Sequence, residues 1–173
     1  MKMLIPLLML ACGAAHAVDR VERGRYLVNT SGCMDCHTTM KMGPKGPEPD
    51  MARMLSGHPE SIAIRAPEAA PPAPWLVLIS GAGNAYAGPW GVSFAANLTP
   101  DAETGLGRWS EDDFVQTMRT GRRMGRGRPL LPPMPVPVYS QMTDDDLKAV
   151  YAYLKTLPPI RNKVPEPIAP SAR

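Results

Sequence analysis

The sequence is poor in cysteine and in aromatic side chains. Its 173 residues include 3 Cys, 3 Trp, 5 Tyr and 2 Phe, against 21 Pro. Only Cys33 and Cys36 lie beyond the N-terminal segment considered below, and one closely spaced pair excludes a disulfide scaffold. A chain with so few large core residues and so many helix breakers has difficulty burying enough surface by itself. We therefore expect a non-protein group to complete the core.

The chain also lacks a strong charge of either sign. Nineteen basic and sixteen acidic residues give a formal net charge of +3, which does not describe a nucleic-acid-binding protein. The basic residues are unevenly placed, with a cluster formed by Arg119, Arg122, Arg123, Arg126 and Arg128. This cluster is either an ordinary solvated face or a surface that steers acidic partners, and both interpretations stay open.

Long hydrophobic runs are missing as well. Residues 1–17 contain Lys2, an apolar stretch over 3–11 and the ending Ala-His-Ala. The stretch is too short to cross a bilayer, and the ending fits the small-x-small cleavage rule, so we predict a signal peptide over 1–17 and export to the periplasm. The alternative is lipoprotein processing with acylation of Cys12. No later segment is long and apolar enough to cross a membrane.

Residues 33–37 read Cys-Met-Asp-Cys-His, which is a C-x-x-C-H motif. In an exported protein this motif is the attachment site of a c-type haem, because two thiols add to two vinyl groups and the adjacent His reaches the iron. We predict Cys33 and Cys36 as thioether anchors and His37 as the proximal ligand of one haem. A thioredoxin-like redox pair or half of a zinc site would not need the His, and no second Cys pair completes a zinc site.

Three segments have helical periodicity with an N-cap and an acidic residue three positions later. The first covers residues 19–32 and the second covers 110–121. The third begins at Thr143, has Leu154 as the last residue of its apolar pattern, and is stopped by Pro158-Pro159. Between residues 40 and 96 the chain is rich in Pro, Gly, Ala and Met, so we expect long loops there, with at most one short helix or strand. The pattern predicts an all-α domain over residues 18–160, followed by a Pro-rich C-terminal tail over 161–173.

A helix leading into C-x-x-C-H, Pro-rich loops and a final amphipathic helix resemble the layout of class I c-type cytochromes. The stretches "NLTPDAETGLGRWSEDDFVQTMRTGR" and "LPPMPVPVYSQMTDDDLKAVYAYLKTLPP" resemble a cytochrome c group associated with membrane-bound bacterial dehydrogenases, including alcohol and gluconate dehydrogenases. The resemblance implies the cytochrome c fold, with three to five short helices and long Pro/Gly-rich loops around one covalently bound haem. Those dehydrogenase subunits carry several haems and often a membrane anchor, whereas this chain has one C-x-x-C-H.

The resemblance also implies a second axial ligand on a loop before the last helix. Residues 130–138 read "LLPPMPVPV", and their prolines disfavour helix and central strand, which leaves Met134 on a stiff loop. In that group the Met of Pro-Met-Pro is the axial ligand, which maps onto Met134. Met142 is an alternative, although it fits better as the apolar residue before a helix cap. His58 is a further alternative, but a loop His is usually polar surface.

A haem iron held by His37 and Met134 would have no open position for a substrate. We therefore expect an electron carrier and not an enzyme, taking single electrons from a dehydrogenase and passing them to a respiratory cytochrome or oxidase. The alternative is a haem enzyme or gas sensor with an open or labile sixth position. Trp109 and Asn97 either hydrogen-bond the haem propionates or serve in packing and turn-capping, respectively.

Overall fold

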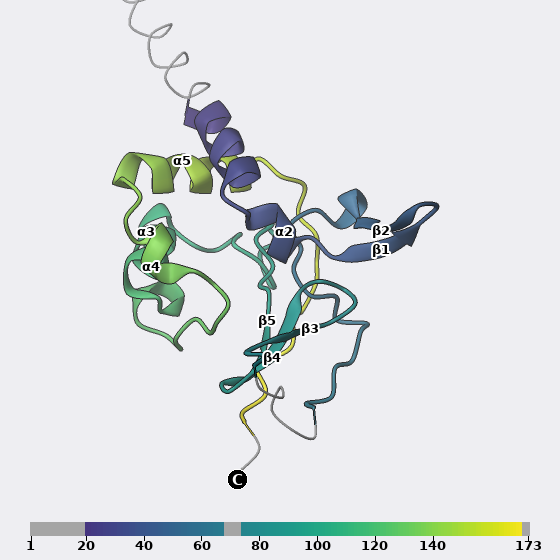
Figure 1. Cartoon of the computed structure of the whole chain (residues 1–173). Helices are drawn as coiled ribbons and strands as arrows, with labels where there is room; N and C mark the ends of the chain where they lie inside the picture. Colours follow the sequence, from purple (N-terminus) through teal and green to yellow (C-terminus); the bar gives the residue numbers. More distant parts are fainter. Residues whose placement is uncertain (1–19, 68–73, 171–173) are drawn as a thin grey trace, which may run out of the picture.

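The computed structural model describes residues 20–67 and 74–170, and Figure 1 shows how they are arranged. The predicted signal peptide over 1–17 and the predicted helix start at Asp19 lie outside the described residues. Within those residues, no helix has both the length and the apolar character needed to span a bilayer.

The predicted helices are present. Residues 20–30 are helical, and the chain then turns through Gly32, which has a positive φ of 77°. The second helix starts with the predicted capping box of Ser110 and Asp113, and it ends at Gly121. The third begins after Thr143 as predicted and ends at Leu154, the last residue of its apolar pattern and ahead of the predicted stop at Pro158. The labelled helices are α2 (Cys33–His37), α3 (Glu111–Thr120), α4 (Val136–Tyr139) and α5 (Asp144–Leu154), with 3-10 turns η1 (Met51–Arg53) and η2 (Arg123–Gly125).

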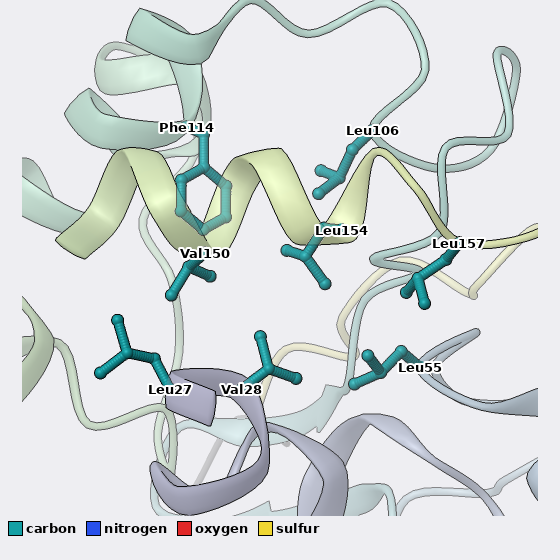
Figure 2. Packing of buried hydrophobic residues seen from close by; sticks show 8 residues of the cluster. All are labelled: Leu27, Val28, Leu55, Leu106, Phe114, Val150, Leu154 and Leu157. Atoms are coloured by element: carbon teal, nitrogen blue, oxygen red, sulfur yellow. The ribbon is translucent and has the colours of Figure 1, made fainter. Parts of the chain in front are cut away.

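The N-terminal helix crosses α5 at very short range. Gly24 makes this possible, because a Cβ at that position would lie 1.9 Å from the carbonyl oxygen of Ala149. Figure 2 shows Val150 and Leu154 of α5 directed toward Leu27 and Val28 of the N-terminal helix. The complete core cluster comprises Leu27, Val28, Leu55, Leu106, Phe114, Val150, Leu154 and Leu157. The N-terminal helix and α5 therefore pack directly against each other in the core.

The prediction of an all-α fold is wrong, because the structure contains two small antiparallel sheets. One is a hairpin and the other has the strand order β3-β4-β5. The strands are β1 (Met40–Gly43), β2 (Gly46–Pro49), β3 (Leu78–Ile79), β4 (Ala85–Gly88) and β5 (Gly91–Phe94). All of them lie in the segment expected to form long loops. They have two to four residues each, too few for an alternating pattern to appear in a sequence rich in Pro and Gly.

The Pro-rich stretch 130–138 also differs from its prediction in one respect. Helix was expected to be disfavoured throughout, yet α4 begins within it at Val136. Pro137 lies in the first turn of this helix, where the missing N–H would have no intrahelical partner, so proline is tolerated there. Residues 130–135, which include Met134, remain outside helices and strands.

Candidate functional site

A cavity of about 560 Å³ is lined by residues of α2, α3, α5 and β5 and of the loops around them. Its volume is within the range of roughly 300–1,000 Å³ that is usual for small-molecule and cofactor sites. The C-x-x-C-H motif, residues of α3 and α5, β5 and the loop carrying Met134 all contribute to its lining. The predicted ligands and anchors therefore share one cavity, although they are separated by about a hundred residues of sequence.

Cys33 and Cys36 lie on the same short helix, α2, and both line the cavity. They are free cysteines and are not joined in a disulfide. Burial, the main cause, raises the pKa of the Cys33 thiol to about 11. Reactive C-x-x-C pairs of the thioredoxin type have a lowered thiol pKa. The environment of Cys33 therefore does not match that alternative.

His37 is the last residue of α2 and is held in a defined orientation. Its Nδ1 lies 2.8 Å from the carbonyl oxygen of Ala96, which can only accept a hydrogen bond. Nδ1 therefore carries the proton, and Nε2 keeps a free lone pair. Burial also lowers the pKa of His37, which favours the neutral ring that a metal requires. The backbone of the same residue is fixed too, since Gly57 N–H donates to the His37 carbonyl at 2.8 Å.

Three methionines line the cavity, namely Met118, Met134 and Met142. Met118 and Met142 also pack against the core cluster, as expected for residues whose main role is structural. Met134 lies on the Pro-rich loop, which is attached to β5 because Ser93 Oγ donates to the Pro132 carbonyl at 2.6 Å. The structure thus brings Met134 and Met142 to the same cavity in different packing environments.

His58 is not the polar surface residue that was expected. It is fully buried, and it is not part of the cavity lining. Its Nδ1 lies 2.8 Å from Asn84 Oδ1, and its Nε2 lies 2.9 Å from the carbonyl oxygen of Ile62. Both ring nitrogens are engaged, so His58 has a structural role in this part of the fold.

Asn97 and Trp109 both line the cavity. The Asn97 side chain accepts hydrogen bonds from the backbone N–H and hydroxyl of Thr99, which is turn-capping. Trp109 packs against the core cluster, and the Arg123 guanidinium lies 5.6 Å from its ring centroid. Asn97 Nδ2 also donates to the Ile160 carbonyl at 2.8 Å, so both side chains are engaged by contacts within the protein.

Several residues that build this site could not be identified from the sequence. Ala96 positions His37 through its carbonyl group, and a backbone acceptor carries no sequence signature. Tyr139 lines the cavity and donates a hydrogen bond to the Ser31 carbonyl, just before α2. Burial, the first cause, raises the pKa of Tyr139 to about 12, so its hydroxyl stays protonated and remains a donor.

The residues present fit a covalently bound haem. The cavity supplies two free thiols, an imidazole with one free nitrogen, and methionine sulfur, which are the groups such a haem uses. Its lining includes four basic side chains, those of Arg123, Arg128, Arg161 and Lys163, and two acidic ones, those of Glu103 and Glu166. The basic excess is appropriate for the two carboxylates of a haem.

Comparison with known proteins agrees with this chemistry. The family model described as Cytochrome c matches residues 21–158. The chain is 29% identical over 169 residues to the cytochrome c subunit of a quinone alcohol dehydrogenase from Gluconobacter oxydans (strain 621H), covering 94% of this chain and 28% of that subunit. It is 32% identical over 133 residues to the gluconate 2-dehydrogenase cytochrome c subunit of Pantoea cypripedii, covering 77% of this chain and 22% of that subunit.

A third relative is the fructose dehydrogenase cytochrome subunit of Gluconobacter japonicus, 28% identical over 136 residues, covering 79% of this chain and 21% of the relative. The chain thus spans about a quarter of the length of these relatives. The resemblance to cytochrome c subunits of alcohol and gluconate dehydrogenases is confirmed. The family match covers well over half of the chain, and it includes the C-x-x-C-H motif and Met134. This chain belongs to the cytochrome c family of electron-transfer proteins, and its cofactor is a covalently attached haem c with iron.

Proposed function

We propose that this protein carries single electrons through one haem c, attached at Cys33 and Cys36 and ligated by His37 and Met134. The observation that carries the proposal is the arrangement around one cavity of both thiols, the His37 imidazole fixed by Ala96, and Met134 on its Pro-rich loop. When bound, the haem supplies one-electron Fe(II)/Fe(III) chemistry. The protein's own residues supply fixed ligands and a largely apolar surrounding.

The ligand set favours transfer over catalysis. If His37 and a methionine both ligated the metal, no coordination position would be free for a substrate. A thioether also stabilises the reduced metal, which raises the reduction potential relative to two histidines. Ligands held by a hydrogen bond and by a proline-stiffened loop need to move little between oxidation states. The protein is therefore an electron carrier and not a catalyst in this proposal.

The proposed partners are redox proteins in the periplasm. The N-terminal segment 1–17 has the features of a signal peptide, so the mature chain would work outside the cytoplasm; lipid attachment at Cys12 is the alternative form of export. The relatives are cytochrome subunits of alcohol, gluconate and fructose dehydrogenases. By analogy, the electron donor is a dehydrogenase and the acceptor is a respiratory cytochrome or oxidase.

The absorption spectrum of the purified haem protein tests this function. We expect the oxidised protein to be low-spin and to show a methionine-to-iron(III) charge-transfer band in the near infrared. We expect the reduced protein not to bind carbon monoxide at neutral pH. A high-spin spectrum together with rapid carbon monoxide binding would instead support a haem enzyme or gas sensor with an open sixth position.

The arginine cluster leads to a second prediction, about partner encounter. Arg119 and Arg128 are held in ion pairs with Asp144 and Glu166. Within the described residues, the other three members, Arg122, Arg123 and Arg126, form no ion pair, and all three are exposed. Arg123 also lines the cavity, so this charge lies beside the site of electron exchange. We propose that these three arginines attract anionic redox partners.

Replacing Arg122, Arg123 and Arg126 with Gln should slow oxidation of the reduced protein by hexacyanoferrate(III) at low salt. The expected decrease is roughly tenfold, and it should disappear at high salt because the attraction is screened. Stopped-flow measurement of the second-order rate constant provides the readout. The matched control replaces Lys45, Arg65 and Arg108, which are exposed, form no ion pair within the described residues and do not line the cavity. Equal rates for the two triple variants would identify the cluster as an ordinary solvated face.

A further inference from the structure

The chain does not stop at the last helix but returns across the molecule to β5. Figure 1 shows this segment, in yellow, running from the end of α5 toward the sheet β3-β4-β5. We call residues 160–168 the C-terminal strap. They fall almost entirely within the region that the sequence predicted as a Pro-rich tail. The strap is neither helix nor part of a named strand, so hydrogen bonds to other segments must hold it in place.

The near end of the strap is attached to the loop that follows β5. The Ile160 N–H donates to Thr99 Oγ1 at 3.1 Å, and the Ile160 carbonyl accepts from Asn97 Nδ2 at 2.8 Å. Two residues later, the Asn162 N–H donates to Thr104 Oγ1 at 3.0 Å. These bonds join the strap to a loop whose residues Asn97 and Thr104 themselves line the cavity.

The Asn162 side chain provides the strongest anchor. It is completely buried. Its Nδ2 donates to the carbonyl groups of Ser56 at 2.7 Å and His58 at 2.9 Å. Its Oδ1 accepts from the Glu60 N–H at 2.9 Å and from Arg53 at 3.2 Å. A buried amide with both ends satisfied fixes the position of the backbone that carries it.

The far end of the strap pairs with β5. Ile168 and Val92 exchange two backbone hydrogen bonds, of 2.8 and 2.9 Å. Gly91 allows this close approach, since a Cβ there would lie 2.0 Å from the Ile168 carbonyl oxygen, and its φ is +91°. The strap is therefore held at both ends.

The part between the two anchors forms one wall of the cavity. Its cavity-lining residues are Arg161, Lys163, Val164, Pro165, Glu166 and Pro167. Glu166 also contacts a second lining residue, since its carboxylate lies 3.4 Å from Nε of Arg128, on the segment that leads to the Met134 loop. Both side chains of this ion pair are exposed, so it contributes little to the stability of the protein.

We propose that the C-terminal strap shields the haem from water and thereby raises its reduction potential. The oxidised iron carries one more positive charge than the reduced iron. Excluding water disfavours the more highly charged state. Releasing the strap should consequently stabilise the oxidised form and lower the potential. The inference rests on a haem occupying this cavity, and it does not depend on which methionine is the axial ligand.

Two charge-neutral substitutions release the far end of the strap from opposite sides. Ile168→Pro removes the N–H that bonds to Val92, and Gly91→Val places side-chain atoms where the Ile168 carbonyl lies. The matched controls are Ile168→Val, which keeps both backbone bonds, and Gly81→Val, since a Cβ at Gly81 would meet open space. No charge changes in any of these variants, so a shift in potential cannot come from an altered charge.

Three measurements on the haem-loaded proteins test the proposal: the midpoint potential, the near-infrared band, and hydrogen exchange of the strap amides and of the Val92 amide that bonds to the strap. In the wild type, the amides of Ile160, Asn162 and Ile168 should be protected. In Ile168→Pro and Gly91→Val, the Val92 amide, which donates to the Ile168 carbonyl in the wild type, should exchange faster, and the potential should fall with the near-infrared band retained. The two controls should match the wild type.

Three results would overturn the proposal. In the first, the strap is released and the potential is unchanged. In the second, the wild-type strap amides exchange as fast as those of an unfolded chain, which would mean that the strap is not seated on the cavity. In the third, the potential falls only together with loss of the near-infrared band, because the cause would then be ligand loss. That third result would leave the proposed electron-carrier function of the wild-type protein intact.

Discussion

Replacing Cys33 and Cys36 together with Ser is expected to eliminate covalent haem attachment and, with it, the stable fold. Serine keeps the size of each side chain but offers no thiol to form a thioether. A dry cavity costs roughly 24 cal/mol per Å³. The site cavity of about 560 Å³ would then cost on the order of 10 kcal/mol if it stayed empty and dry. This is comparable to the whole folding free energy of a typical domain, roughly 5–15 kcal/mol.

Haem staining after denaturing gel electrophoresis measures the covalent attachment, and thermal unfolding followed by circular dichroism measures the fold. We expect no stain and no cooperative transition near that of the wild type for the double variant. Cys12→Ser is the matched control, since Cys12 is the third cysteine and lies in the predicted signal peptide. It should retain full haem stain. Full staining of the double variant would contradict the assignment of the two anchors.

The same control tests the form of export. If the protein is a lipoprotein, Cys12→Ser should move it from the membrane fraction to the soluble fraction. If a signal peptidase cleaves after Ala17 instead, the substitution should leave its distribution unchanged, and the mature protein should begin at Val18. Mass spectrometry of the mature N-terminus distinguishes the two forms directly.

The helices could be predicted because their determinants are local. The Ser110 hydroxyl accepts from the Asp113 N–H, and the Asp113 carboxylate accepts from the Ser110 N–H, so both partners lie within four residues. Thr143 caps α5 in a similar way. Such pairs can be read from the sequence without knowledge of the tertiary structure.

The sheets were missed although the sequence contains a signal for them. The hairpins β1-β2 and β4-β5 each turn on the pattern Gly-Pro-x-Gly, at residues 43–46 and 88–91, with the two glycines paired across the turn. Proline after the first glycine and glycine at the end are typical of tight turns. The strands on either side are so short that Pro and Gly dominated the interpretation, and the segment was assigned to loops.

The haem motif could be predicted but its surroundings could not. Cys33, Cys36 and His37 lie within five residues, whereas His37 meets Ala96 across 59 positions of sequence. Asn162 contacts Ser56 and His58 across more than a hundred. The residues that orient the ligand and close the cavity act through backbone groups and long-range contacts, and these leave no local pattern. The predicted tail thus belongs, in three dimensions, to the wall of the cavity.

The second large effect is expected for Met134→Ala, which should remove the near-infrared charge-transfer band. Alanine cannot coordinate iron, so the sixth position would open, carbon monoxide would bind to the reduced protein, and the reduction potential would fall. Visible and near-infrared spectroscopy and a redox titration measure these changes. The substitution should have little effect on the fold, because Met134 lies on a loop stiffened by prolines and attached to β5 through Ser93.

Met142→Ala is the matched control, because both methionines line the same cavity but only Met142 also packs against the core cluster. It should keep the band and the potential while losing roughly 2 kcal/mol of stability, as expected for truncation of a packed methionine. The reverse pattern would assign the ligand to Met142. A band retained in both single variants and lost only in the double variant would mean that either sulfur can reach the iron. In that case the two methionines could exchange as the sixth ligand. The rate of this ligand exchange, and not ligand identity alone, would then distinguish an electron carrier from an open haem site.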